Sequence, residues 1–158
     1  MSVHAILVAI KKAVSYTTRR TGITYTQSSV YSTNAAATYS NMNDDSADES
    51  VSTETGTNSS GSEWVKADQG SSLFIEKIII GYDYLNNLPG GWGVSYTEGK
   101  TIETSDDNTN WTNRGTTPTY SGTGSTDGLV SINIGVTARY IRITSSGYMC
   151  LTEFSLWY

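Results

Sequence analysis

An all-β sandwich is the fold that this sequence predicts, and three observations indicate it. The 158 residues include 23 Thr, 22 Ser and 11 Tyr, and only 16% of them are charged. Thr and Tyr suit a pleated, half-buried surface, whereas Ser and the 15 Gly suit its turns. After residue 63, short segments of alternating character follow one another, separated by Gly, Pro, Asn and Asp. Seven or eight such strands are typical of a sandwich or jelly roll.

The strands are expected over seven segments, at 64–68, 74–84, 100–105, 111–114, 129–134, 139–144 and 151–158. In the fifth segment Val130, Ile132 and Ile134 alternate with the residues between them, which predicts one buried face. Before the first strand, residues 28–62 form a long polar stretch. Its composition would suit a disordered linker, but it contains scattered aromatic and apolar residues and leads directly into Trp64.

Residues 1–27 are interpreted as an N-terminal extension, and residues 28–158 as the sandwich domain. Val3, Ile6, Leu7 and Ile10 follow a helical spacing, although the continuous apolar run 5–10 also suits a buried strand. Segments 15–18 and 23–27 resemble a short hairpin around the turn 19–22. An apolar stripe this short is not stable alone in water. We therefore expect these four side chains in an intermolecular interface, most simply in a homotrimer or on a particle surface.

Several classes of function are excluded by composition. Cys150 is the sole cysteine and His4 the sole histidine, so a disulfide within the chain, a zinc site of cysteines and a histidine cluster are all excluded. The net charge of −5 argues against nucleic-acid and anionic membrane partners. The N-terminus shows no secretion signal, because its apolar core is short and its lysines follow that core. We expect synthesis in a cytoplasm.

The order of four segments is similar to that of a known family. The segment WVKADQG at 64–70, followed by Ile75 and III at 78–80, resembles the "W-hydrophobic-x-V-D-L-G" segment of discoidin domains. These are also called coagulation factor 5/8 type C domains, and they are similar to family 32 carbohydrate-binding modules. Segments 102–111 (IETSDDNTNW), 138–143 (ARYIRI) and 151–156 (LTEFSL) resemble its later motifs. Gln69 and Asp45 depart from the usual Leu and Gly, and the paired cysteines of secreted members are absent.

The resemblance implies an eight-stranded antiparallel jelly-roll sandwich, in agreement with the fold class expected from composition. Together with the alternation of the strands, it predicts a core between two sheets. The residues expected there are Trp64, Ile78, Ile80, Ile102, Trp111, Ile132, Ile141, Ile143 and Phe154.

A structural calcium ion is a further expectation. The acidic loop 43–49 is rich in the oxygen ligands that calcium prefers. The resemblance implies that Asp44 or Asp45, Thr53 and Glu153 hold the ion. The alternative is a solvated acidic loop, with Glu153 paired to Arg139 or Arg142. The Asp at 45 weakens the calcium expectation, because a Gly would supply a left-handed turn there.

The candidate ligand site lies on loops that the resemblance places at one end of the sandwich. Aromatic faces pack against sugar rings, and amide side chains bond their hydroxyls. Residues of that kind are Tyr84, Asn86, Asn87 and Trp92 in the loop 82–96, and Tyr120 in the loop 116–128. The alternative is that Tyr82 and Tyr84 continue a strand and Trp92 anchors its own loop.

We expect a non-catalytic protein. The sole histidine lies in the extension, and the pair Asp106 and Asp107 falls in an expected turn, where Asp bonds its own backbone. The favoured function is a carbohydrate-binding adhesion module of a virion, such as a bacteriophage tail fibre or decoration protein, exported by lysis. The alternative is a structural fibre or capsid cement protein that uses the jelly roll for protein contacts.

Overall fold

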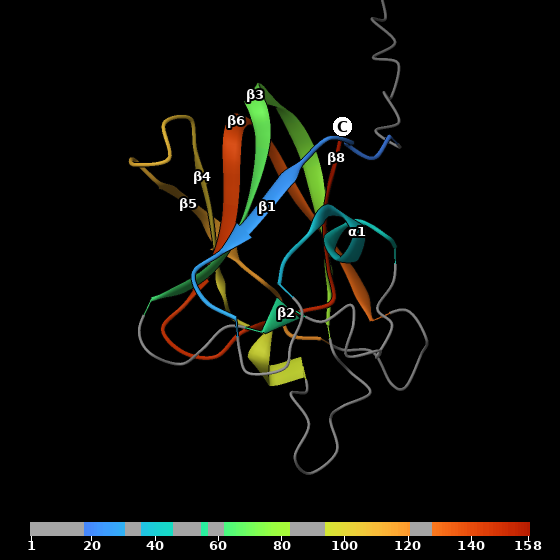
Figure 1. The fold of residues 1–158 in the computed structure, drawn as a ribbon, viewed down its shortest axis with the longest axis vertical. Helices are drawn as coiled ribbons and strands as arrows, with labels where there is room; N and C mark the ends of the chain where they lie inside the picture. Colours follow the sequence, from blue (N-terminus) through green and yellow to red (C-terminus); the bar gives the residue numbers. More distant parts are fainter. Residues whose placement is uncertain (1–17, 31–35, 46–54, 57–61, 83–93, 121–127) are drawn as a thin grey trace, which may run out of the picture.

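The structure is a computed structural model, and it describes residues 18–30, 36–45, 55–56, 62–82, 94–120 and 128–158. Nearly all of its regular elements are strands (Figure 1). Their order is β1 (Thr24–Gln27), α1 (Tyr39–Met42), β2 (Thr55–Gly56), β3 (Glu63–Gly81), the 3-10 helix η1 (Val94–Tyr96), β4 (Thr101–Ser105), β5 (Thr112–Thr116), β6 (Leu129–Ser145), β7 (Cys150–Leu151) and β8 (Glu153–Trp157).

Two long antiparallel strands, β3 and β6, organise the fold (Figure 1). In their first pairing, residues 63–68 of β3 pair with residues 140–145 of β6. This pair forms the middle of a sheet with the strand order β1-β3-β6-β4-β5. In their second pairing, residues 77–81 of β3 pair with residues 129–133 of β6. The same part of β3 pairs with β8 along its other edge. Each strand therefore bends midway and contributes to both layers. The segments expected as separate strands at 64–68 and 74–84 correspond to the two halves of β3, which ends at Gly81, and those at 129–134 and 139–144 are halves of β6.

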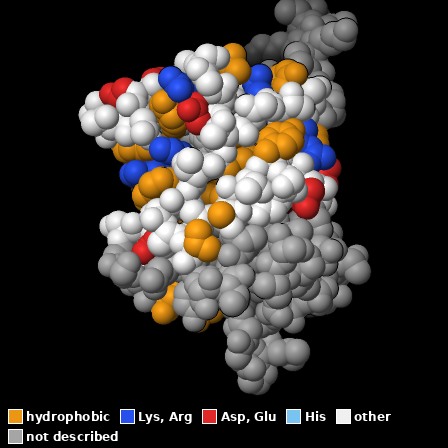
Figure 2. Space-filling view, in the orientation of Figure 1, with side chains coloured by type: hydrophobic (Ala, Val, Ile, Leu, Met, Phe, Trp, Pro, Cys, Tyr) orange, Lys and Arg blue, Asp and Glu red, His pale blue; other side chains and the backbone are white. Residues whose placement is uncertain are grey.

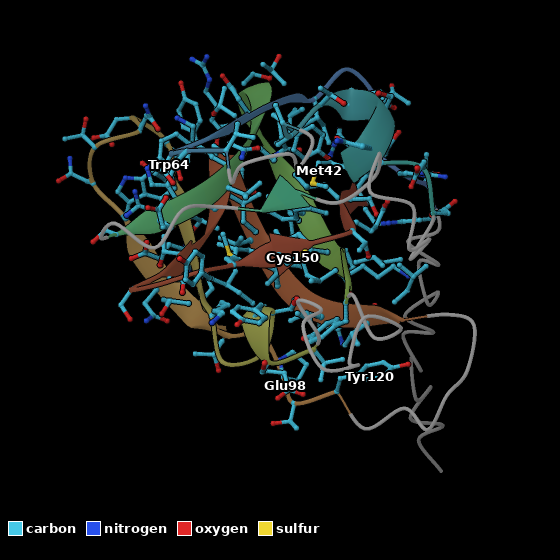
Figure 3. All side chains as sticks on the ribbon, turned by 60° about the horizontal axis from the view of Figure 1, so that its bottom comes forward. Met42, Trp64, Glu98, Tyr120 and Cys150 are labelled. Atoms are coloured by element: carbon cyan, nitrogen blue, oxygen red, sulfur yellow. The ribbon has the colours of Figure 1, made fainter. Side chains whose placement is uncertain are left out.

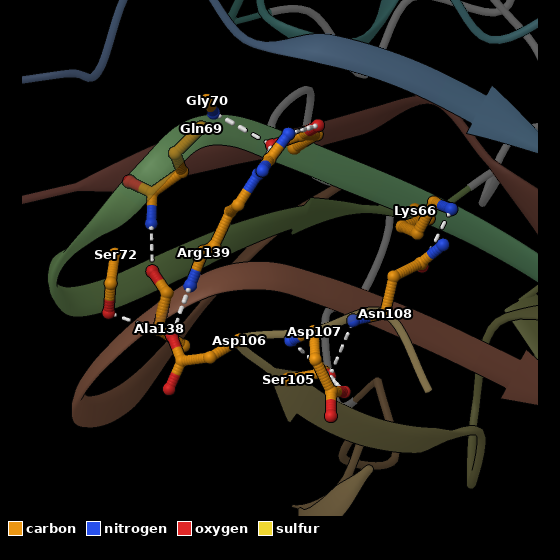
Figure 4. Close-up of polar contacts among 11 residues, drawn as sticks. Lys66, Gln69, Gly70, Ser72, Ser105, Asp106, Asp107, Asn108, Ala138 and Arg139 are labelled. Atoms are coloured by element: carbon orange, nitrogen blue, oxygen red, sulfur yellow. Dashed lines mark hydrogen bonds and ion pairs between the residues drawn. The ribbon is translucent and has the colours of Figure 1, made fainter. Parts of the chain in front are cut away.

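The bends of β3 and β6 are held by polar contacts at one end of the sandwich. We call this end, formed by residues 69–72, 106–110 and 135–138, the bend end (Figure 4). Gly70 takes a left-handed φ of 78°, and its N–H donates to Asp68 at 2.7 Å. Arg139 donates to the same carboxylate through Nε and Nη2, at 2.9 and 3.0 Å. These hydrogen bonds from Arg139 lower the pKa of Asp68.

A second carboxylate connects the bend end to the turn after β4 (Figure 4). Asp106 accepts from the N–H of Arg139 at 3.0 Å and from the hydroxyl of Ser72 at 2.7 Å. The Gln69 amide donates to the carbonyl of Ala138 at 2.8 Å. The motif residues around 68–70 and 105–107 therefore fix the backbone at the bend end.

The core lies between the two layers. It contains Ile78, Ile80, Ile102, Ile141, Ile143 and Phe154, all fully buried as expected, and Ile132 packs against it while partly exposed. Tyr25 adds a buried hydroxyl, which donates to the carbonyl of Phe154 at 2.6 Å. Burial raises the pKa of Tyr25 well above its ordinary value.

The expectation that Trp64 and Trp111 lie in the core is wrong. On β3 the core positions are Val65 and Ala67, so Trp64 points to the outer face and is only half-buried. The guanidinium of Arg142 lies 3.8 Å from the ring centre of Trp111, which is also half-buried. Lys66 lies 4.9 Å from the ring centre of Trp64. Cations over aromatic faces stabilise such a half-exposed surface, and Figure 2 shows basic and hydrophobic side chains alternating on the side where β4 and β5 lie.

Residues 18–27 pack on the domain rather than on one another. The backbone N–H of Thr18 donates to the carbonyl of Tyr158 at 3.3 Å, and Tyr158 returns a bond at 3.1 Å. β1 pairs with β3, and Ile23 and Tyr25 lie in the core. The hairpin expected over 15–27 is therefore wrong for its described part. The interface residues Val3, Ile6, Leu7 and Ile10 lie outside the described residues. In the described part of the chain, no helix is long and apolar enough to cross a membrane.

Candidate functional site

The end of the sandwich opposite the bend end carries the long connections, and we call it the loop end. It comprises the described residues 82, 94–100, 117–120, 128 and 146–149 (Figures 1 and 3). Tyr82 and Tyr120 stack there with ring centres 5.5 Å apart and an interplanar angle of 26°. Tyr82 is buried and donates to the carbonyl of Pro118 at 2.8 Å, whereas Tyr120 is half-buried. Tyr82 thus stacks against a second ring that is partly exposed, although the hydroxyl oxygen of that ring is buried.

The backbone around Tyr120 is fixed by neighbouring turns. Glu98 follows η1, and its carboxylate accepts the N–H of Tyr120 at 2.7 Å. Figure 3 shows Glu98 and Tyr120 close together at this end, with Trp64 on the opposite side. The Thr117 hydroxyl donates to the Thr97 carbonyl and accepts the N–H of Lys100. An aromatic ring beside a carboxylate is a pairing suited to the C–H face and the hydroxyls of a sugar.

Of the predicted ligand residues, the structure describes only Tyr120. Tyr84, Asn86, Asn87 and Trp92 lie outside the described residues, so their roles remain predictions. The sequence reasoning missed Glu98 and the supporting role of Tyr82. The signal for Tyr82 was its position at the end of an apolar run, where an aromatic residue was interpreted only as continuing a strand.

Glu153 is the second feature of interest, because it is a fully buried carboxylate. It lies on β8 beneath α1 and the residues that follow α1. The backbone N–H groups of Asp44 and Asp45 donate to its Oε2 at 3.0 and 3.2 Å. Burial, followed by the nearby charges of Asp44 and Asp45, raises the pKa of Glu153 to about 8. The alternative pairing of Glu153 with Arg139 or Arg142 is wrong, since these pair with Asp68 and Glu103.

The turn at Asp45 keeps the conformation that a glycine would supply. Its φ is 61°, in the left-handed region that Asp tolerates better than most residues. Its carboxylate forms an ion pair with Arg19, which also donates to the carbonyl of Asn43. The loss of the family glycine therefore does not remove the turn.

The predicted calcium ligands are brought together in part. Glu153 lies directly against Asp44 and Asp45, whereas Thr53 is outside the described residues. Among the described residues, no three His, Cys, Asp or Glu side chains form a metal-binding group. Of the five buried side-chain oxygens that have no hydrogen-bond partner in the described part of the chain, two belong to Glu153 (Oε1) and to Asn43 (Oδ1), which directly precedes Asp44. Uncompensated buried oxygens are costly, and both are of the kind that calcium takes as ligands.

Both acids of the pair at the bend end already hold hydrogen bonds, Asp106 across the bend to Arg139 and Ser72, and Asp107 within its own turn. Asp107 accepts the N–H groups of Asn110 and Thr109 at 2.7 and 2.8 Å. The N–H of Asn110 is the largest influence that lowers the pKa of Asp107. This confirms the turn interpretation for Asp107, and a lowered pKa is the opposite of what a general acid needs.

Comparison with known proteins agrees with this geometry. The family model described as F5/8 type C domain matches residues 24–158, so the chain belongs to that family. No curated protein shows a significant match to the chain.

Solved structures of the same fold include a Streptococcus pneumoniae fucose binding module, with 19% identity over 84% of this chain and 89% of that chain, and a TM-score of 0.66. A family 32 carbohydrate-binding module of AlyQ, in complex with 4,5-unsaturated mannuronic acid, shows 21% identity over 88% and 97%, with a TM-score of 0.63. A Clostridium perfringens module in complex with GalNAc-β-1,3-galactose shows 14% identity over 85% and 94%, with a TM-score of 0.61. These likenesses confirm the antiparallel sandwich.

Proposed function

We propose that this domain binds a glycan at its loop end and does not transform it. The observation that carries the proposal is the Tyr82–Tyr120 stack, whose second ring is partly exposed and whose backbone N–H is held by the carboxylate of Glu98. Several proteins of similar fold are described as modules that bind fucose or other sugars, which supports the same class of ligand. A rigid aromatic ring gives contact area to a sugar at low entropic cost.

A calcium ion beneath α1 is part of the proposal. The two unpartnered oxygens of Glu153 and Asn43 fit it, and Asp44 or Asp45 would supply further oxygen. The ion would act structurally, since it would hold the residues after α1 on β8. It would replace an uncompensated buried carboxylate by a paired one.

A virion location and a trimer formed through residues 1–14 are finer proposals that rest on the sequence alone. Sedimentation of the full chain at micromolar concentration tests the trimer. A monomer would remove self-assembly from the proposal.

The test of glycan binding is a glycan array with Tyr120→Ala. Loss of the stacked ring should weaken binding by about tenfold, because aromatic contacts contribute roughly 0.5–1.5 kcal/mol beyond their buried area. Tyr158→Ala is the matched control, since Tyr158 is 42% exposed and lies with the C-terminus, away from the loop end (Figure 1). Absence of binding by the unaltered chain would favour the structural cement protein. Equal binding by both variants would remove Tyr120 from the site.

A further inference from the structure

The loop end contains a second hollow, separate from the Tyr120 stack. It has a volume of about 340 Å³ and lies where β3 and β4 begin and β6 ends. Its lining is almost entirely hydroxylic, with a single charged side chain: Ser62, Lys100, Thr101, Thr144, Ser145 and Ser146. We call it the Lys100 pocket. Thr101 and Thr144 are register partners, and Thr144 also pairs with Trp64, so an aromatic residue flanks the pocket.

The backbone at Lys100 is held in place by bonds to one residue. The N–H of Lys100 donates to the Thr117 hydroxyl at 2.8 Å, and its carbonyl accepts the N–H of Thr117 at 2.8 Å. Gly99, with a left-handed φ of 66°, donates to the carbonyl of Thr117 at 2.9 Å. The base of the lysine side chain is therefore positioned before any ligand arrives.

The ammonium of Lys100 has no counter-charge in the described part of the chain. The ion pairs found there belong to Arg19, Arg139 and Arg142. Two acids lie close in the fold, but their hydrogen bonds point elsewhere. Glu98 accepts the N–H of Tyr120, and Glu63 accepts the hydroxyls of Ser28 and Ser29.

An unpaired cation in a partly desolvated pocket is unfavourable until an anion joins it. Burial lowers the pKa of Lys100, and among the described residues no opposite charge raises it again. A bound anion would supply that charge, and hydrogen bonds to charged groups are among the stronger ones in proteins. Hydroxyls around the cation serve both as donors to the anion and as partners for neighbouring sugar hydroxyls.

We propose that the Lys100 pocket binds the acidic group of a glycan, a uronate carboxylate or a sugar sulfate. The inference rests on the proposed function and narrows its substrate class from glycans in general to acidic ones. The volume lies at the lower end of the range for ligand pockets, which suits one sugar unit. The net charge of −5 repels anions at long range, so recognition depends on this local cation.

The test is a titration of the full chain with three probes, sodium glucuronate, glucose 6-sulfate and glucose, followed by backbone amide NMR. The two acidic probes should bind at least about tenfold more tightly than glucose, the lower bound for a hydrogen bond to a charged group. Shifts should concentrate at residues 99–101 and 144–146. A preference for only one acidic probe would identify the carboxylate or the sulfate as the natural group.

Lys100→Gln should abolish the preference for acidic probes, and Lys100→Arg should keep it. Lys77→Gln is the matched control, because Lys77 lies over Trp157 on another strand and should leave the preference unchanged. Equal binding of glucuronate and glucose, in a chain that binds neutral glycans on the array, would overturn the acidic-group inference and leave the proposed function standing. Failure to bind any glycan or probe would overturn both.

Discussion

Gly81 offers a sharp test of how tightly the two layers are joined. A Cβ at this position would lie 2.2 Å from Oγ1 of Thr152, 2.5 Å from the backbone nitrogen of Glu153 and 2.8 Å from the Cβ of Glu153. All three distances are shorter than real contacts, and two involve groups that cannot rotate away. Gly81 also pairs directly with Glu153, so Gly81→Ala must displace β8 from β3.

The expected cost of Gly81→Ala is about 1–3 kcal/mol, the usual range for overpacking a closed core. In a domain of this size, that corresponds to a loss of about 2–12 °C in melting temperature. Urea denaturation followed by circular dichroism measures the free energy of unfolding directly. Gly147→Ala is the control, because nothing lies within 4 Å of the added Cβ, and its effect should stay within about 0.5 kcal/mol. A midpoint for Gly81→Ala equal to that of Gly147→Ala would refute the close approach of the strands.

Four further predictions concern buried and half-buried groups. Tyr25→Phe should cost about 1–3 kcal/mol in a denaturant melt, because the buried carbonyl of Phe154 loses its donor. Without calcium, the raised pKa of Glu153 means that the folded state holds a proton that the unfolded state has released. Stability should therefore fall as pH rises from about 4.5 through 8, and Glu153→Gln should remove that dependence. Millimolar calcium should raise the melting temperature, increasingly so towards pH 8, and identical melts with chelator and calcium would exclude the ion. Trp111→Ala should lower the free energy of unfolding by less than about 3 kcal/mol, the lower limit for removing a buried aromatic side chain, because the ring of Trp111 is half-exposed.

The sequence predicted the strands well and their continuity poorly. Gln69, Gly70 and the serines that follow have the composition of a turn, and Gly70 does adopt a left-handed conformation. The chain nevertheless continues as one bent strand, because Asp68 and Arg139 bridge the bend. The alternation of residues distinguished the two faces of β3 but did not show which face is buried. The smaller Val65 and Ala67 lie in the core, whereas Trp64 lies on the outer face, where Lys66 packs over its ring.

The candidate site depended on information that no local pattern carries. Asp44 and Asp45 contact Glu153 although more than 100 residues separate them in the sequence. Only the family resemblance predicted this contact. Periodicity could not show that Glu153 is buried, because every residue from 153 to 156 is buried and the strand shows no alternation. Nothing in the sequence singled out Lys100, because only the fold shows that no described acid pairs with it.

The backbone bonds between Thr18 and Tyr158 also determine how the domain responds to force. The chain enters beside the point where it leaves, and both lie away from the loop end (Figure 1). A force applied at these two residues would break the backbone hydrogen bonds between residues 18–20 and 156–158 one after another, rather than loading all of them at once in shear. The contact of residues 18–20 with β8 should therefore open at low tension, while the long β3–β6 ladder behind it stays intact. A ligand held at the loop end would remain bound during that first opening.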